Sequence, residues 1–277
     1  MKSYSVNNIR NIAIAGHTGK GKTALAEAMF YVAGVTDRLG RVIDGNTIMD
    51  YDAEEKKRKC SISAATASLE WRDTKINILD APGKFDFAGG MAETMRAADC
   101  ALIVTSAGSG IDVGLEKAIK AADARNIAKF FAVTKVDSEN RDFYKTLGDL
   151  QDKYGTAICP VVIPFVENDA VTCYINLIEN KAYAFDGLTA KEFRMPVSAE
   201  IENMRNMLLE AIASADEELM EKYFSGEEFT KEEILKGLKS GVKSGDICPV
   251  FCGVQASGDA ISLFADILYK ILPSADM

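Results

Sequence analysis

The feature that most constrains this chain is a glycine-rich turn, Gly16–Thr23, between two apolar runs. The run before it, Ile12–Ala15, is typical of a buried strand, and the run after it, Ala24–Phe30, is typical of a helix. A turn that reads G-x-x-x-x-G-K-T between a strand and a helix is the phosphate-binding loop, or P-loop. The sequence therefore predicts an α/β protein with a polyphosphate site at the end of its first strand.

The residues of this turn suit the chemistry of a polyphosphate. Gly16 and Gly21 let the backbone turn tightly enough to aim N–H groups at the phosphates, and the helix dipole adds to that field. Lys22 supplies a positive charge to the outer phosphates, and Thr23 supplies a hydroxyl ligand for Mg²⁺. The alternative is a glycine turn that only caps a helix. It is disfavoured because strand, loop, Lys-Thr pair and helix occur together.

A second motif, Asp80–Gly83, directly follows the apolar run Ile76–Leu79. This places it at the carboxyl end of a strand, where α/β sheets bind their ligands. Asp80 is expected to be the second partner of Mg²⁺, usually through water, and the Gly83 N–H to reach a γ-phosphate. The motif is a common turn when it stands alone. One strand beyond a P-loop, it predicts a nucleoside triphosphate site.

A third motif, Thr134–Asp137, follows the apolar run Phe130–Val133. A carboxylate at Asp137 can accept hydrogen bonds from both N1–H and the exocyclic amine of guanine, a donor pair that adenine lacks. The stem of Lys135 can lie along the purine face while its ammonium group stays in water. An ordinary turn at a strand end is the alternative, but the agreement among the three motifs favours a guanine site.

The chain between the first two motifs is polar and irregular, and it ends in the charge run Glu54–Lys59. We expect a solvated loop there, or a switch segment that folds only around a bound nucleotide. Ser61–Trp71 and Ile76–Leu79 then predict two strands of a hairpin at one edge of the sheet.

A different pattern begins in the second half of the chain. Val161–Ile178 reads as strands, followed by a loop over residues 179–196. Glu200–Ala215 has the apolar spacing of a helix. Pro249–Cys252 then resumes the sheet, and Ala260–Ile271 reads as a closing helix.

A chain of 277 residues can form one large domain or two small ones. We predict that residues 1–156 and 246–277 form a doubly wound, mostly parallel α/β domain and that residues 157–245 form an inserted α+β subdomain. The formal charge of −9, from 32 basic and 41 acidic side chains, argues against autonomous nucleic-acid binding. No signal peptide or membrane span is visible, and the cysteines lack C-x-x-C spacing. We expect a cytoplasmic monomer that does not bind membranes.

The motifs occur in the order found in translational GTPases, and the chain resembles the GTP-binding (G) domain of elongation factor G. Met49–Ile62 resembles its switch I segment, Asp80–Phe87 its switch II, and Thr134–Asp137 its guanine motif. Cys248–Ser274 looks like its final strand and helix. The acidic stretch Asp216–Tyr223 is similar to the insert that distinguishes this factor from simpler GTPases.

This resemblance implies a P-loop NTPase G domain that binds GTP and GDP with Mg²⁺ and hydrolyses GTP. It also implies that the nucleotide state switches affinity for the ribosome, through later domains that are absent here. The implied nucleotide contacts are Gly16, His17, Thr18, Gly19, Lys20, Gly21, Lys22, Thr23, Asp80, Ala81, Pro82, Gly83, Lys84, Thr134, Lys135, Asp137, Gly253, Val254 and Gln255. The implied Mg²⁺ ligands are Thr23, Ser61 and Asp80. The implied catalytic residues are Asp80, Gly83 and Lys84.

Two departures from the family's pattern bear on catalysis and base binding. Lys84 stands where the family has its catalytic histidine, and the only histidine of the chain is His17 in the P-loop. We therefore expect slow hydrolysis of GTP. Thr134 replaces the asparagine of the guanine motif, and this shorter side chain is expected to hold the base less tightly.

Other departures are milder. Ser61 aligns with a threonine that helps to hold Mg²⁺, and it keeps the hydroxyl. Val254 and Gln255 replace a serine and an alanine, so backbone N–H contacts survive and the serine hydroxyl does not. Lys20 replaces a small P-loop residue, and its ammonium group either lies near the phosphates or, as we favour, points into solvent.

Three alternatives stay open for the function. A ribosomal protection factor or a factor for release-factor recycling would share this domain. A regulatory module that binds GTP and hydrolyses it negligibly is favoured by Lys84. An ATP-using P-loop enzyme is disfavoured by Asp137.

Overall fold

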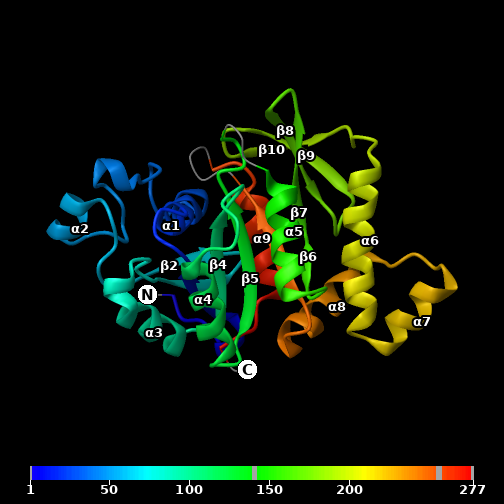
Figure 1. Ribbon diagram of the computed structural model, residues 1–277, viewed down its shortest axis with the longest axis horizontal. Helices are drawn as coiled ribbons and strands as arrows, with labels where there is room; N and C mark the ends of the chain where they lie inside the picture. The colour runs from blue at the N-terminus through cyan, green and yellow to red at the C-terminus, as the bar shows by residue number, and fades with distance from the viewer. Residues whose placement is uncertain (1, 139–141, 254–257, 276–277) are drawn as a thin grey trace.

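A computed structural model describes residues 2–138, 142–253 and 258–275 of the chain. In the described residues, the main sheet has seven strands in the order β2-β3-β1-β4-β5-β11-β6. Every neighbouring pair is parallel except β2 with β3. The strands are β1 (Ile9–Ala15), β2 (Ala65–Trp71), β3 (Thr74–Asp80), β4 (Cys100–Ser106), β5 (Ala128–Thr134), β6 (Ile158–Pro160) and β11 (Cys248–Cys252). The predicted mostly parallel α/β sheet and its edge hairpin are confirmed (Figure 1).

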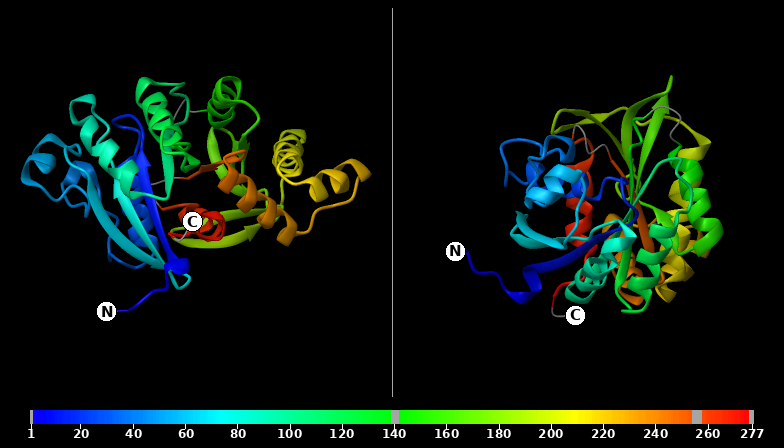
Figure 2. Two further views of the ribbon diagram at one scale, coloured as in Figure 1. Left: turned by 90° about the horizontal axis from the view of Figure 1, so that it is seen from below. Right: turned by 60° about the vertical axis from the view of Figure 1, so that its left-hand side comes forward.

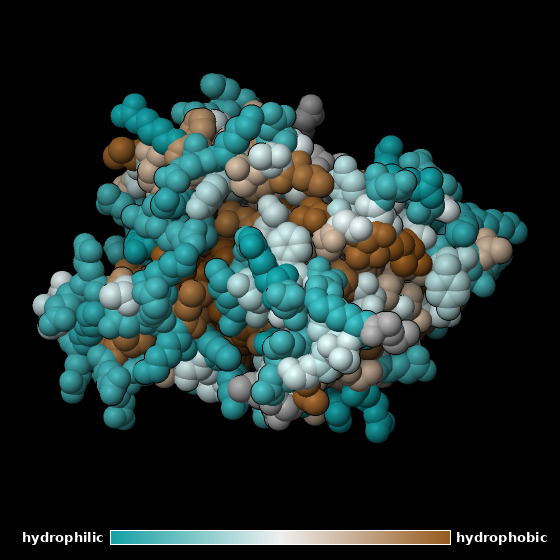
Figure 3. Space-filling view, turned by 180° about the vertical axis from the view of Figure 1, so that it is seen from behind, coloured by the Kyte–Doolittle hydropathy of each residue, from teal (hydrophilic) through white to brown (hydrophobic). Residues whose placement is uncertain are grey.

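Helices cover both faces of this sheet, which makes the fold doubly wound. One face carries α3 (Ala88–Ala97), α4 (Val113–Asp123) and α5 (Phe143–Tyr154) (Figure 2). The other face carries α1 (Lys22–Val32), α8 (Lys231–Ser244) and α9 (Ile261–Ile271) (Figure 2). Because both faces are covered, every residue of the central strand β4 is buried. Seen from behind, apolar side chains gather in a hollow near the middle of the molecule, with hydrophilic residues around them (Figure 3).

A second sheet is antiparallel and has the order β10-β9-β8-β7. Its strands are β7 (Val162–Glu167), β8 (Ala170–Asn176), β9 (Lys181–Asp186) and β10 (Thr189–Phe193). Asn168 and Asp169 join β7 to β8 with φ of 51° and 62°, the paired positive angles of a tight hairpin turn. The predicted loop over residues 179–196 is therefore wrong. The strand β10 escaped prediction because all five of its residues are exposed, which leaves no apolar alternation to detect.

Two helices, α6 (Ala199–Ser214) and α7 (Glu217–Ser225), complete the second half of the chain. α6 packs against β6 of the main sheet and against α7 and α8. The region predicted as an insert, residues 157–245, thus contributes one strand to the main sheet, and its helix α8 covers β5. The boundaries at 156/157 and 245/246 stay a prediction.

The charge run expected to be a loop forms a short helix, α2 (Ala53–Arg58). Asp52 caps its first turn and Glu55 completes a capping box. Acidic side chains lie in the first turn and basic ones in the last turn, so the run matches the helix dipole. β2 begins at Ala65, four residues after the predicted start at Ser61. No helix in the described part of the chain is long and apolar enough to cross a membrane.

Candidate nucleotide-binding site

The P-loop leaves the carboxyl end of β1 and enters α1 at Lys22. Gly16 has a φ of +139°, and a Cβ atom there would lie 2.3 Å from the carbonyl oxygen of Val104 in β4. Gly21 directly precedes the helix with a φ of +90°. Residues with side chains rarely adopt these angles, so both positions call for glycine.

Lys22 is the buried cation of the site. The residue is only 6% exposed, and its ammonium group donates to the carbonyl oxygen of His17 at 2.9 Å. Burial lowers the pKa of Lys22, and the charges of Asp80, Asp112 and Asp50 partly oppose that shift. A buried ammonium group is costly unless an anion compensates its charge, so this position suits a phosphate.

Hydroxyl and carboxylate oxygens from three segments meet beside Lys22. The Thr23 hydroxyl donates to Asp80 Oδ2 at 2.6 Å and lies 3.2 Å from the Ser61 hydroxyl. Ser61 in turn donates to Asp50 Oδ1 at 2.7 Å. The second oxygens of Asp80 and Asp50 are buried and have no hydrogen-bond partner among the described residues. These oxygens fit a hard divalent cation such as Mg²⁺, which binds oxygen ligands.

The structure thus brings together the three metal ligands predicted from the sequence, Thr23, Ser61 and Asp80. Asp50 is a fourth member that the sequence analysis placed in switch I without a role. It is only 2% exposed. Nothing in the local sequence marks it, because its place depends on how the chain from residue 33 to residue 64 packs against α1.

The electrostatics of Asp80 also fit a cation. Burial raises the pKa of its carboxyl group to about 7, and Lys22 and the Thr23 hydrogen bond act in the opposite direction. A divalent cation at this position would favour the ionised carboxylate and offset the cost of its burial.

The guanine motif lies at the end of β5, next to the P-loop. The Thr134 hydroxyl lies 2.7 Å from the carbonyl oxygen of Lys20 and 3.1 Å from that of Thr105. Lys135 donates to the carbonyl oxygen of Gly19 at 2.8 Å, and Asp137 is exposed. Thr134 is fully buried, so its place suits holding the P-loop backbone rather than contacting a base.

A cavity of about 270 Å³ connects these parts. It is lined by the P-loop, by Asp50 and Ser61 of switch I, by Gly83 and by Lys135. Gly83 comes so close to the P-loop that a Cβ atom there would lie 2.3 Å from Lys22 Nζ and 2.7 Å from the backbone nitrogen of Thr18. Phosphate-binding backbone, a buried cation and the oxygen cluster therefore face one space.

Residues 7–274 match the elongation factor Tu GTP binding domain family. The chain belongs to this family. A protein from Thermus thermophilus with a known crystal structure is 34% identical in sequence, with a TM-score of 0.89 and coverage of 97% of this chain. The chain covers 41% of the length of that protein. It has the P-loop G-domain fold of these GTP-binding domains, with an additional β subdomain.

The structure corrects the prediction for Lys20 of this GTP-binding domain. Its ammonium group lies 3.3 Å from Asp112 Oδ2, and its side chain is only 16% exposed. Asp112 also caps α4 by accepting from the backbone N–H of Leu115 at 2.8 Å. The Lys20 side chain therefore points to the start of α4 and not into solvent, and its contact with a nucleotide stays a prediction.

The predicted switch II segment, Asp80–Phe87, leaves the end of β3, passes through Gly83 and ends in a short 3₁₀ helix, η3 (Phe85–Phe87). Lys84 is exposed, and it forms no ion pair with the residues that the structure describes. Phe85 beside it lies between His17, with ring centroids 5.8 Å apart, and Lys117, whose ammonium group is 4.1 Å from the ring centre. These contacts attach switch II to the P-loop and to α4.

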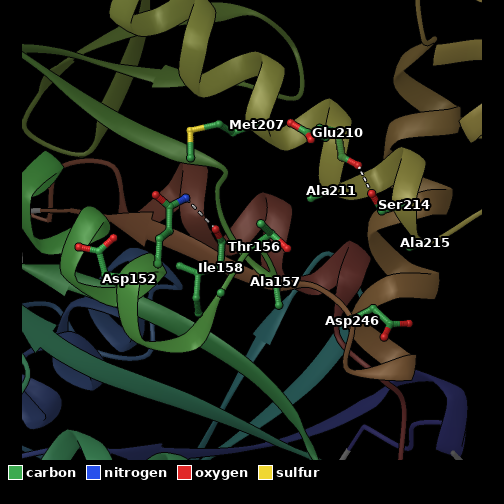
Figure 4. Close-up of a pocket in the computed structure, with 12 residues that line it drawn as sticks. Asp152, Thr156, Ala157, Ile158, Met207, Glu210, Ala211, Ser214, Ala215 and Asp246 are labelled. Carbon is green, nitrogen blue, oxygen red and sulfur yellow. Dashed lines mark hydrogen bonds between the residues drawn. The ribbon is translucent and has the colours of Figure 1, made fainter. Parts of the chain in front are cut away.

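A larger cavity of about 460 Å³ lies away from the nucleotide site, between α5, β6 and α6 (Figure 4). Gln151 donates to the carbonyl oxygen of Ile158, and Ser214 to that of Glu210, so these polar groups are satisfied by backbone. The cavity contains none of the predicted site residues. The predicted site residues Lys22, Ser61 and Gly83 line the smaller cavity instead. Of the predicted contacts, Gly253 is buried at the end of β11, and Val254 and Gln255 lie outside the described residues.

Proposed function

We propose that this chain is the GTP-hydrolysing domain of a protein like elongation factor G, and that its nucleotide state switches affinity for the ribosome. The observation that supports this most is the cluster of Thr23, Ser61 and Asp80. It joins the P-loop, switch I and the start of switch II through one hydrogen bond of 2.6 Å and one hydroxyl contact of 3.2 Å. A ligand that reaches all three segments can couple their positions to the presence of its last phosphate.

In this proposal Thr23 and Ser61 bind Mg²⁺ directly, and Asp80 acts through water. The metal ion would neutralise charge on the phosphate oxygens. Lys22 and the P-loop N–H groups hold the phosphates, and the Gly83 N–H meets the γ-phosphate. Asp137 selects guanine, with Lys135 along the purine face and Gly253, Val254 and Gln255 contributing backbone contacts.

Hydrolysis is expected to be slow. The attacking water has to be oriented in line with the γ-phosphate. A protonated lysine such as Lys84 donates hydrogen bonds but cannot accept one, so it orients water less well than a histidine. The exposed position of Lys84 favours a second candidate, a regulatory module that binds GTP with negligible hydrolysis. A ribosomal protection or recycling factor is the candidate within the family.

The rest of the proposal concerns the setting. Residues 157–245 form an inserted subdomain, the protein acts in the cytoplasm, and ribosome contacts come largely from domains outside this chain. The isolated chain is expected to be a monomer without autonomous nucleic-acid or membrane binding.

Calorimetric titration of the purified chain with GDP, GTP and ADP tests the proposal. We expect GDP and GTP to bind more tightly than ADP by several powers of ten. Equal affinities for ADP and GDP would overturn it.

A further inference from the structure

Glu55 is a buried carboxylate whose hydrogen bonds reach beyond its own helix. It is only 2% exposed and forms no ion pair with the described residues. Its Oε1 atom accepts from the backbone N–H groups of Ile62 at 2.9 Å and Ser63 at 3.1 Å. Its Oε2 atom accepts from the N–H of Asp52 at 3.3 Å, the bond that completes the capping box. The two oxygens therefore have separate tasks, and Oε1 holds the chain just after Ser61.

Glu27 plays a matching part at the other end of switch I. It lies on α1, one turn after the P-loop, and is only 1% exposed. Its Oε1 atom accepts from the N–H groups of Ile48 at 2.7 Å and Met49 at 3.2 Å, just before Asp50. The chain also packs closely around this carboxylate, because a Cβ atom at Gly40 would lie 2.2 Å from Glu27 Oε2.

The segment between these two anchors contains the switch I half of the oxygen cluster. Asp50 and Ser61 are bonded to each other at 2.7 Å, and Ser61 lies 3.2 Å from Thr23. Fixing the backbone on both sides of the pair limits where these oxygens can go. A buried carboxylate is costly unless N–H groups satisfy it, so each anchor also resists displacement.

We propose that Glu27 and Glu55 are positioning residues that hold Asp50 and Ser61 at the metal site and thereby favour the triphosphate with Mg²⁺ over the diphosphate. This inference rests on the proposed function, because it assumes that Thr23, Ser61 and Asp80 meet Mg²⁺ and GTP. Neither carboxylate touches the nucleotide or the metal ion; each acts through the backbone beside a residue that does.

A purely structural role for Glu55 is the competing explanation, since it also caps α2. Asp52→Ala removes the other half of the cap but leaves the backbone N–H of residue 52 and the bonds from Glu55 to Ile62 and Ser63. If Glu55 acts only through the stability of α2, Asp52→Ala and Glu55→Ala have the same effect. Glu54→Ala changes a partly exposed residue of the same helix, paired with Arg58 at 2.6 Å, and is the surface control.

The test measures binding of fluorescent GTP and GDP to the whole chain over a range of Mg²⁺ concentrations. We expect Glu55→Ala and Glu27→Ala to weaken Mg²⁺-dependent GTP binding about tenfold, as loss of a buried acceptor of this kind implies. GDP binding in EDTA should change less than about twofold, since the P-loop is untouched. Glu27→Gln keeps one oxygen for both N–H groups and should restore selectivity for GTP. Asp52→Ala and Glu54→Ala should behave as the native chain.

Limited trypsin digestion gives a second measurement, because Lys56, Lys57, Arg58 and Lys59 lie between the anchors. GTP with Mg²⁺ should slow cleavage there in the native chain relative to GDP, and the two rates should converge in Glu55→Ala and Glu27→Ala. Thermal unfolding checks that the variants are folded. Unchanged GTP selectivity in both alanine variants, or an equal loss in Asp52→Ala, would overturn this inference alone. A native chain without Mg²⁺-dependent GTP binding would overturn the proposed function and this inference with it.

Discussion

The ammonium group of Lys20 lies 3.3 Å from a carboxylate oxygen of Asp112, the residue that caps α4. A side chain of the P-loop thus contacts the start of α4, which covers the face of the sheet opposite to α1 (Figure 2). Gly114 in that turn comes so close to His17 that a Cβ atom there would lie 2.6 Å from the His17 backbone. The P-loop is therefore held from outside the nucleotide site as well as by its own glycines.

This arrangement predicts the effect of Lys20→Ala. Because the ammonium group faces α4, its loss should weaken GTP and GDP binding by the same small factor. The free energy of unfolding should fall by about 1 kcal/mol, which is the upper end of the range for exposed ion pairs. We expect this upper value because both side chains of the pair are mostly buried. Chemical denaturation of the single variants and of the Lys20→Ala/Asp112→Ala double variant measures the coupling. A much larger loss for GTP than for GDP would mean that Lys20 acts on the γ-phosphate.

Thr134 and Asp137 should separate into two roles. Thr134→Ala removes the hydroxyl that lies 2.7 Å from the Lys20 carbonyl oxygen, so all nucleotides should bind about tenfold more weakly, without a change in base preference. Asp137→Asn should instead weaken GDP and strengthen binding of xanthosine diphosphate, whose carbonyl group accepts from the new amide. Competition binding with both diphosphates measures this. A change in base preference in Thr134→Ala would contradict the separation.

The sequence predicted the parts of the fold that rest on local signals. Strands such as Phe130–Val133 carry continuous apolar runs. The turn Gly16–Thr23 has a residue pattern that is specific to the P-loop. Strand β10 and helix α2 carried weaker signals. Strand β10 has no buried face, and α2 depends on a two-residue capping box within a charge run that also suits a loop.

The missed site residues share a different cause. Asp50, Glu27 and Asp112 gain their roles from partners that are distant in the sequence, such as Ser61, Met49 and Lys20. No spacing rule connects a carboxylate on α1 with the backbone of switch I. Lys20 was expected in solvent for the same reason, since its partner Asp112 lies 92 residues further along the chain.

The oxygen cluster predicts how the site depends on Mg²⁺. Thr23→Ala removes the hydroxyl that donates to Asp80 at 2.6 Å. GTP binding should therefore need an Mg²⁺ concentration about tenfold higher than in the native chain. Binding of GDP in EDTA should change less, because the lost hydroxyl is proposed to act through the metal ion. Ser61→Ala should affect GTP more than GDP, since switch I is expected to close on the triphosphate. Isothermal titration with and without EDTA tests this, and equal losses for both nucleotides in both variants would contradict the assigned ligands.

The presence of a lysine at position 84 leads to a prediction for the rate of GTP hydrolysis. Stabilising GTP in the ground state with a positive charge does not by itself accelerate the chemical step. We therefore expect tight GTP binding with very slow turnover by the native chain. Lys84→Ala should change GTP affinity modestly and slow turnover little further. Lys84→His should orient the attacking water and raise ribosome-stimulated hydrolysis in the full-length protein about a hundredfold, near the lower end of what a positioned acid or base contributes.

The decisive measurement is single-turnover hydrolysis of GTP with ribosomes by the native protein, Lys84→His and Lys84→Ala. Lys117→Ala is a matched control, because it removes another exposed lysine close to switch II, whose ammonium group lies over the Phe85 ring. It should change neither the rate nor its response to ribosomes by more than about twofold, since a single exposed cation–π contact contributes about 0.5–1 kcal/mol. Rapid native turnover that collapses in Lys84→Ala would show that the lysine is catalytic through its charge on the transition state. Slow turnover in all variants, Lys84→His included, would favour the regulatory module. It would mean that a water-orienting side chain at position 84 is not enough to start hydrolysis.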